Sequence, residues 1–145
     1  MDLPEDVRER FREFGRVGGR RRATRLTPAA RSELARYAAT LRWIRRRFGD
    51  ASFERLGLPG GEVIDAGLKD LVGARATPES LAVSVAAPRL RREGVPVTTP
   101  LPEPEFRLYE LLEGTEGELA HARYNALMRR VVSFADACRL SRVDS

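Results

Sequence analysis

The stretch TPAARSELARYAATLRWIRRRF, residues 27–48, decides the fold class of this chain. Threonine followed by proline is a strong helix start, because the threonine oxygen can cap free backbone N–H groups and proline is favoured at the first helical position. From there apolar residues recur at alternating spacings of three and four. This pattern predicts one helix with a narrow apolar seam made of Leu34, Tyr37, Leu41, Ile44 and Phe48.

Further helix signals follow immediately downstream. Asp50 can cap a brief turn that carries Phe53 and Leu56, ahead of the glycine-rich turn at 57–61. A second amphipathic helix is predicted up to about Gly73, with an apolar side formed by Val63, Ile64, Leu68, Leu71 and Val72. Glu62 and Asp65 are expected on its solvated side, opposite Ile64 and Leu68.

The segment after Thr77-Pro78 allows two interpretations. Over residues 81–87, β-branched valines alternate as they would in a strand. The threonine–proline cap and the apolar spacing of four instead favour a helix that is bent or restarted at Pro88. We favour the helix, and the strand stays open as the alternative.

The last third of the chain contains a proline-rich segment and two helix patterns. Residues 95–104, VPVTTPLPEP, hold four prolines and predict an extended connector. A short helix is expected over 105–113. Thr115 and Glu118 stand in the capping-box relation, which predicts the start of a final helix that runs to about Leu140. The sequence therefore predicts an all-α domain over residues 27–145.

The N-terminal residues 1–26 form a separate region with a strong basic bias. Pro4 predicts a short helix that ends near Gly15, with Val7, Phe11 and Phe14 on one side. Residues 15–25 have no apolar period, which predicts a basic, partly flexible extension. Residues 1–48 hold 14 basic and 6 acidic side chains, whereas residues 49–145 hold 12 and 15. Positive charge is thus concentrated at one end of the chain.

Several classes of function are disfavoured by composition. No apolar run approaches the ~18 residues of a membrane span, and the first residues are charged. We therefore expect a cytoplasmic protein without a membrane partner. One cysteine and one histidine, His121, predict no metal site. With no evident nucleophile beside His121 and no phosphate-binding glycine loop, we expect no catalytic residues, no cofactor and no enzymatic activity.

Nucleic-acid binding has better support, because small side chains flanked by guanidinium groups let a helix approach a phosphate backbone closely. In the helix over 28–48, Ala35 and Ala39 share a side with three arginines, and an arginine-rich arm precedes it. The predicted contacts are Arg16, Arg20, Arg21, Arg22, Arg25, Arg31, Arg42 and Arg46. The alternative is that these arginines only occupy a solvated side. A protein partner is expected at Trp43, His121, Tyr124 and Asn125, although Trp43 suits a buried anchor equally well.

Residues 18–43 resemble a pattern found near the start of many short bacterial proteins: a glycine pair, basic residues, Leu-Thr/Ser-Pro, then a helix ending Ala-Ala-x-x-Arg-Trp. The matching residues are Gly18, Gly19, Leu26, Thr27, Pro28, Arg31, Ala35, Ala38, Ala39, Arg42 and Trp43. Residues 53–138 are loosely similar to proteins associated with nucleotidyltransferase-type toxin–antitoxin loci. The resemblance implies a non-enzymatic, antitoxin-like regulator that binds DNA and a toxin encoded nearby. The alternative is a protein-interaction or scaffold subunit with no nucleic-acid role.

Overall fold

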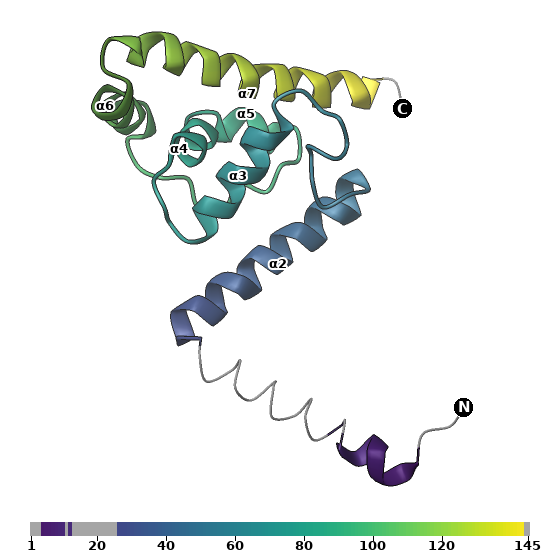
Figure 1. The fold of residues 1–145 in the computed structure, drawn as a ribbon. Helices are drawn as coiled ribbons and strands as arrows, with labels where there is room; N and C mark the ends of the chain where they lie inside the picture. The colour runs from purple at the N-terminus through teal and green to yellow at the C-terminus, as the bar shows by residue number, and fades with distance from the viewer. Residues whose placement is uncertain (1–3, 11, 13–25, 144–145) are drawn as a thin grey trace. The chain divides into compact units, whose positions relative to one another are not determined.

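The computed structural model describes residues 4–10, 12 and 26–143. Within these residues every regular element is a helix and no strand occurs, which confirms the all-α class (Figure 1). The chain divides into two compact units, residues 1–35 and 36–145, with the boundary inside helix α2. In the first unit, residues 5–10 and 12 are helical. Phe11, Phe14 and the basic arm at 16–25 lie outside the described residues.

Helix α2, Pro28–Phe48, has the bounds that the sequence predicts. Its start is capped as expected, since Thr27 Oγ1 accepts a hydrogen bond from the backbone N–H of Ala30 at 3.1 Å. The apolar seam is buried at one end only: Ile44 is buried, whereas Leu34 is 53% exposed. The predicted helix carries the seam residues, although a shared side of a helix does not by itself make every member buried.

The second unit is built from a compact set of helices. They are α3 Gly61–Val72, α4 Pro78–Val85, α5 Ala87–Arg92, α6 Pro104–Glu116, the 3-10 turn η1 Gly117–Leu119 and α7 Ala120–Val143. Helix α4 contacts α3, α6 and α7, and α7 also contacts α3 and α6 (Figure 1). Leu81, Ala82 and Val83 of α4 are each at most 1% exposed, so α4 lies at the centre of the core.

Residues 81–85 belong to α4 and Ala87 starts α5, with Ala86 as the turn between them, so that the segment is helical rather than a strand. Thr77 caps α4 through a capping box with Ser80, whose hydroxyl accepts from the backbone N–H of Thr77 at 2.8 Å. The helix restarts as α5 at Ala87, with Pro88 in its first turn, as predicted. Valines at alternating positions are accommodated because α4 is buried on nearly all sides rather than on one.

The predicted capping box at Thr115 is wrong. Thr115 lies inside α6, and its Oγ1 donates a hydrogen bond to the backbone carbonyl of Leu111 at 3.1 Å. The chain turns at Gly117, whose φ of 58° lies in the left-handed region that glycine tolerates. The break between α6 and α7 therefore depends on a glycine two residues after the threonine.

The proline-rich connector is irregular up to Glu103, and Pro104 is the first residue of α6. Val95 and Val97 are each 2% exposed and anchor the connector in the core. Its carbonyl at Val97 accepts from Arg91 Nε at 2.6 Å. Farther along, the backbone N–H of Leu101 donates to Ser84 Oγ at 3.0 Å. The connector is thus tied to α4 and α5, with an exposed stretch at residues 98–100 between the two anchors.

Candidate nucleic-acid interface

Three aromatic rings hold the C-terminal end of α2 on the core. Phe48 and Phe53 are 4.9 Å apart between ring centroids, and Phe53 is 4.9 Å from Phe134 of α7, both in edge-on geometry. Phe53 and Phe134 are fully buried, and Phe48 is half-buried. Edge-to-face rings of this kind add stabilisation beyond the apolar area that they bury. The end of α2 is therefore anchored through the turn that follows it.

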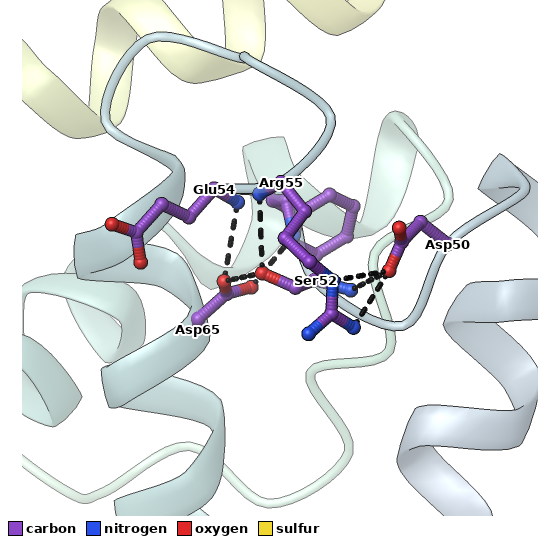
Figure 2. Close-up of polar contacts among 6 residues, drawn as sticks. Asp50, Ser52, Glu54, Arg55 and Asp65 are labelled. Carbon is purple, nitrogen blue, oxygen red and sulfur yellow. Dashed lines mark hydrogen bonds and ion pairs between the residues drawn. The ribbon is translucent and has the colours of Figure 1, made fainter.

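Asp65 of α3 organises that turn, residues 50–55 (Figure 2). Its Oδ1 accepts from the backbone N–H of Phe53 at 2.9 Å. Its Oδ2 accepts from Ser52 Oγ at 2.7 Å and from the backbone N–H of Glu54 at 3.2 Å. The expected solvated position of Asp65 is thus wrong, because a turn from 11 to 13 residues earlier in the chain supplies three donors.

Asp50 closes the same turn from its other side. Its Oδ1 accepts from the backbone N–H of Ser52 at 3.0 Å and from Arg55 Nη2 at 2.8 Å (Figure 2). The hydrogen bond from Arg55, followed by that from Ser52, lowers the pKa of Asp50 below its usual value. The expected capping role of Asp50 is confirmed, and the chain leaving α2 is held by two carboxylates.

Residues 36–48 of α2 present a row of exposed arginines. At ~100° per residue, Ala39, Arg42 and Arg46 point away from the buried Ile44, and all three are exposed. We call Ala39, Arg42 and Arg46 the arginine face. It is flanked by the exposed side chains of Arg36, Arg45 and Arg47. In the first unit, Arg31 and Ala35 are also exposed.

Among the described residues, the arginines of α2 differ from many arginines on other elements in having no carboxylate partner. Arg55, Arg75, Arg89, Arg130 and Arg139 form ion pairs with Asp50, Asp70, Asp136, Glu62 and Asp136, respectively. Within the described part of the chain, no ion pair involves an arginine of α2. Helix α2 contains six arginines and one glutamate. Uncompensated guanidinium groups at this density create a positive surface potential.

Trp43 lies beside the arginine face, partly covered by the connector. Its side chain is 41% exposed and lines a hollow together with Arg91 and residues 94–98. Arg47 lies against the same segment, since a Cβ added at Gly94 would be 3.0 Å from Arg47 Nε. Trp43 is therefore neither fully buried nor free: one part packs and the rest remains available for stacking.

Two hollows are each lined by residues of both α2 and α3. They measure about 250 and about 330 Å³, and both are lined by Thr40 and Leu68. The larger one also contains Tyr37 and Asp65. Burial, followed by the negative charge of Asp65, raises the pKa of Tyr37.

The other predicted partner residues gather where α6 meets α7, together with Tyr109, which the sequence does not mark as a partner residue. Tyr109 Oη and His121 Nδ1 share a hydrogen bond of 2.7 Å, and Asn125 Nδ2 lies 3.2 Å from His121 Nε2. The rings of Tyr109 and Tyr124 stack with centroids 4.3 Å apart. Burial, followed by the charge of Glu105, raises the pKa of Tyr124. Only the packing of α6 on α7 reveals Tyr109, since its partners lie 12 or more positions later.

Comparisons with protein-family models, with curated proteins and with solved structures find no match to this chain. Among the residues described, no three side chains of the metal-binding types gather into one group. None of the helices that the structure describes combines the length and apolar character needed to cross a membrane. Of the predicted nucleic-acid contacts, Arg31, Arg42 and Arg46 are exposed on α2, and the five in the basic arm lie outside the described residues.

Proposed function

We propose that this protein binds nucleic acid through the arginine face of α2, as a non-enzymatic regulator. The observation that carries the proposal is the row of exposed arginines that have no carboxylate partner among the described residues. They lie on a helix whose other side is anchored by Ile44 and Phe48. Ala39 contributes no bulk between the guanidinium groups, so that a phosphate backbone could approach the helix closely. Arginine also suits this role through its planar, bidentate donors.

The basic arm is proposed to extend the same interface. It contributes Arg16, Arg20, Arg21, Arg22 and Arg25, on the evidence of sequence alone. Binding of this kind is dominated by release of counterions from phosphates, and it therefore weakens steeply with salt and depends little on base sequence.

The experiment is a fluorescence-anisotropy titration of double-stranded DNA across a salt series. Each phosphate contact contributes about 0.9 to the slope of log affinity against log salt. The double variant Arg42→Gln/Arg46→Gln should therefore lower the slope by roughly two units. Replacing Arg20, Arg21 and Arg22 with alanine should lower it by about two to three units, and both variants should weaken all sequences alike.

The matched control is Arg123→Gln/Arg129→Gln, which removes the same charge from exposed positions on α7. Its slope should stay close to that of the wild type, because the proposal places no phosphate contact there. If both double variants lowered the slope equally, the effect would come from net charge alone and not from contacts made by the arginine face. Absence of binding by the wild type at low salt would remove the nucleic-acid role and favour the alternative, a protein-interaction or scaffold subunit.

The antitoxin-like role implied by the sequence resemblance remains a separate prediction. It requires a protein partner, proposed at Trp43 and at the His121, Tyr124 and Asn125 group. Co-purification of the chain with the product of the adjacent gene tests it. A complex that survives high salt would indicate a largely apolar interface rather than capture by the arginines.

A further inference from the structure

The outer side of α6 displays a large apolar side chain between acidic ones. Phe106 is 68% exposed, the highest value among the exposed large apolar residues of the described chain. Glu110 and Glu113 follow it at spacings of four and three, so that the three residues share one side of the helix. Leu108 and Leu112 face the core instead. We call Phe106, Glu110 and Glu113 the Phe-Glu face.

The surroundings of this face are strongly acidic. Residues 103–118 contain six glutamates and one basic residue, Arg107. All six glutamates are exposed, and in the described part of the chain none of them forms an ion pair. The neighbouring stack of Tyr109 and Tyr124 holds α6 against α7, so that the face is presented on a supported helix. The domain therefore carries uncompensated charge of opposite sign on α6 and on α2.

The two faces also match in register. Ala39, Arg42 and Arg46 occupy positions i, i+3 and i+7 of α2, and Phe106, Glu110 and Glu113 occupy i, i+4 and i+7 of α6. Each face therefore spans about two turns, ~10.5 Å. If the helices run parallel, the Phe106 ring lies over the small Ala39 while the two glutamates reach the two arginines. A large side chain then faces a small one, and negatively charged side chains face positively charged ones, along the whole length of the two faces.

We propose that the Phe-Glu face of one copy of this protein binds the arginine face of a second copy. The occupant is a second copy because the matching charge and register are found on this chain itself. Such an interface joins two different surfaces, so that it either closes into a ring or continues as a head-to-tail series. It goes beyond nucleic-acid binding and does not depend on it, although the paired arginines would be hidden from a phosphate backbone.

The test is sedimentation velocity of the full chain, without nucleic acid, over a protein concentration series at low and at high ionic strength. The wild type should form larger species as its concentration rises at low salt, and high salt should reverse this because the paired charges are exposed to screening. A single monomeric species at every concentration in low salt would overturn the proposal.

Two variants, each with one face disabled, sharpen the test. Phe106→Ala/Glu110→Gln/Glu113→Gln disables the Phe-Glu face, and Arg42→Gln/Arg46→Gln disables the arginine face. Each variant alone should associate at least about tenfold more weakly than the wild type, since interface anchors commonly account for this much affinity. Mixed together, they should form a one-to-one complex that grows no further, because only one intact face of each kind remains.

The control variant, Glu9→Gln/Glu54→Gln, neutralises two exposed glutamates outside α6 and should associate like the wild type. Circular dichroism establishes that each variant is folded before it is compared. Association of either disabled variant at wild-type strength, or a mixture that remains two monomers, would overturn the pairing. Because no nucleic acid is present, neither result bears on the DNA titration, and the two proposals can fail separately.

Discussion

Asp65 Oδ1 accepts a hydrogen bond from the backbone N–H of Phe53 at 2.9 Å, so that α3 directly holds the residue whose ring packs against the end of α2. The same carboxylate also accepts hydrogen bonds from the Ser52 hydroxyl and from the backbone N–H of Glu54. One acidic side chain thus connects the helix that carries the arginine face to the buried core.

Replacing Asp65 with asparagine should destabilise the fold. The amide keeps one acceptor oxygen but turns an NH₂ group toward donors that the carboxylate satisfied. Loss of such hydrogen bonds typically costs about 1–3 kcal/mol. Urea unfolding measures the change in the free energy of unfolding. Glu54→Gln is the control and should stay within about 0.5 kcal/mol, since only the backbone N–H of Glu54 contacts Asp65. Equal stability of Asp65→Asn and the wild type would contradict the assigned role.

Two glycine-to-alanine substitutions should change the free energy of unfolding in opposite directions. Gly67 lies within α3, where helix propensity alone favours alanine by about 1 kcal/mol. A Cβ there would meet Val83 Cγ2 at 2.5 Å and the carbonyl oxygen of Glu79 at 2.8 Å. Gly67→Ala should therefore destabilise the protein by about 1–3 kcal/mol. Gly114→Ala in α6 meets nothing within 4 Å and should stabilise by about 0.5–1 kcal/mol. Chemical denaturation compares the two; stabilisation by Gly67→Ala would refute the close approach of α3 to α4.

The two ends of the α2 seam should respond differently to truncation. Ile44 is 2% exposed, and Ile44→Ala should cost about 2–5 kcal/mol through lost burial and a residual cavity. Leu34 is 53% exposed, and Leu34→Ala should change the free energy of unfolding by less than about 0.5 kcal/mol. Thermal and urea unfolding of the pair provide the measurement. Similar losses at both positions would mean that the seam is buried along its whole length.

The contribution of Asp50 to the free energy of unfolding should decrease as the pH falls. Its pKa is lowered in the folded protein, first by the hydrogen bond from Arg55 and then by that from the backbone N–H of Ser52. The unfolded chain therefore takes up this proton more readily as the pH falls. The stabilisation is present above the unfolded pKa of about 3.9 and is lost as the pH falls through the lower, folded value.

Asp50→Asn should accordingly be less stable than the wild type at neutral pH, with a difference that narrows in acid. Urea unfolding of both proteins from neutral pH down to well below about pH 4 measures this difference. If the difference in the free energy of unfolding stayed constant across that range, the charge of Asp50 would not stabilise the fold through Arg55.

The sequence by itself determined the all-α class and most helix starts. Thr27-Pro28 and Thr77-Pro78 mark helices because capping is a local interaction between residues three positions apart. Periodicity likewise placed Ile44, Leu68 and Leu71 in the core, since residues on one side of a helix share an environment. The exposed arginines of α2 could also be predicted, because charged residues opposite an apolar seam remain in water.

Only the tertiary structure decided which residues from separate elements meet. Asp65 has the spacing of a solvated residue, yet it binds a turn that precedes it, and Tyr109 meets His121 across two helices. Leu34 and Ile44 belong to one stripe but differ in burial, and Gly67 is required by a valine side chain from another helix. These relationships depend on packing between segments distant in sequence, and local spacing carries no information about how far a neighbouring element extends.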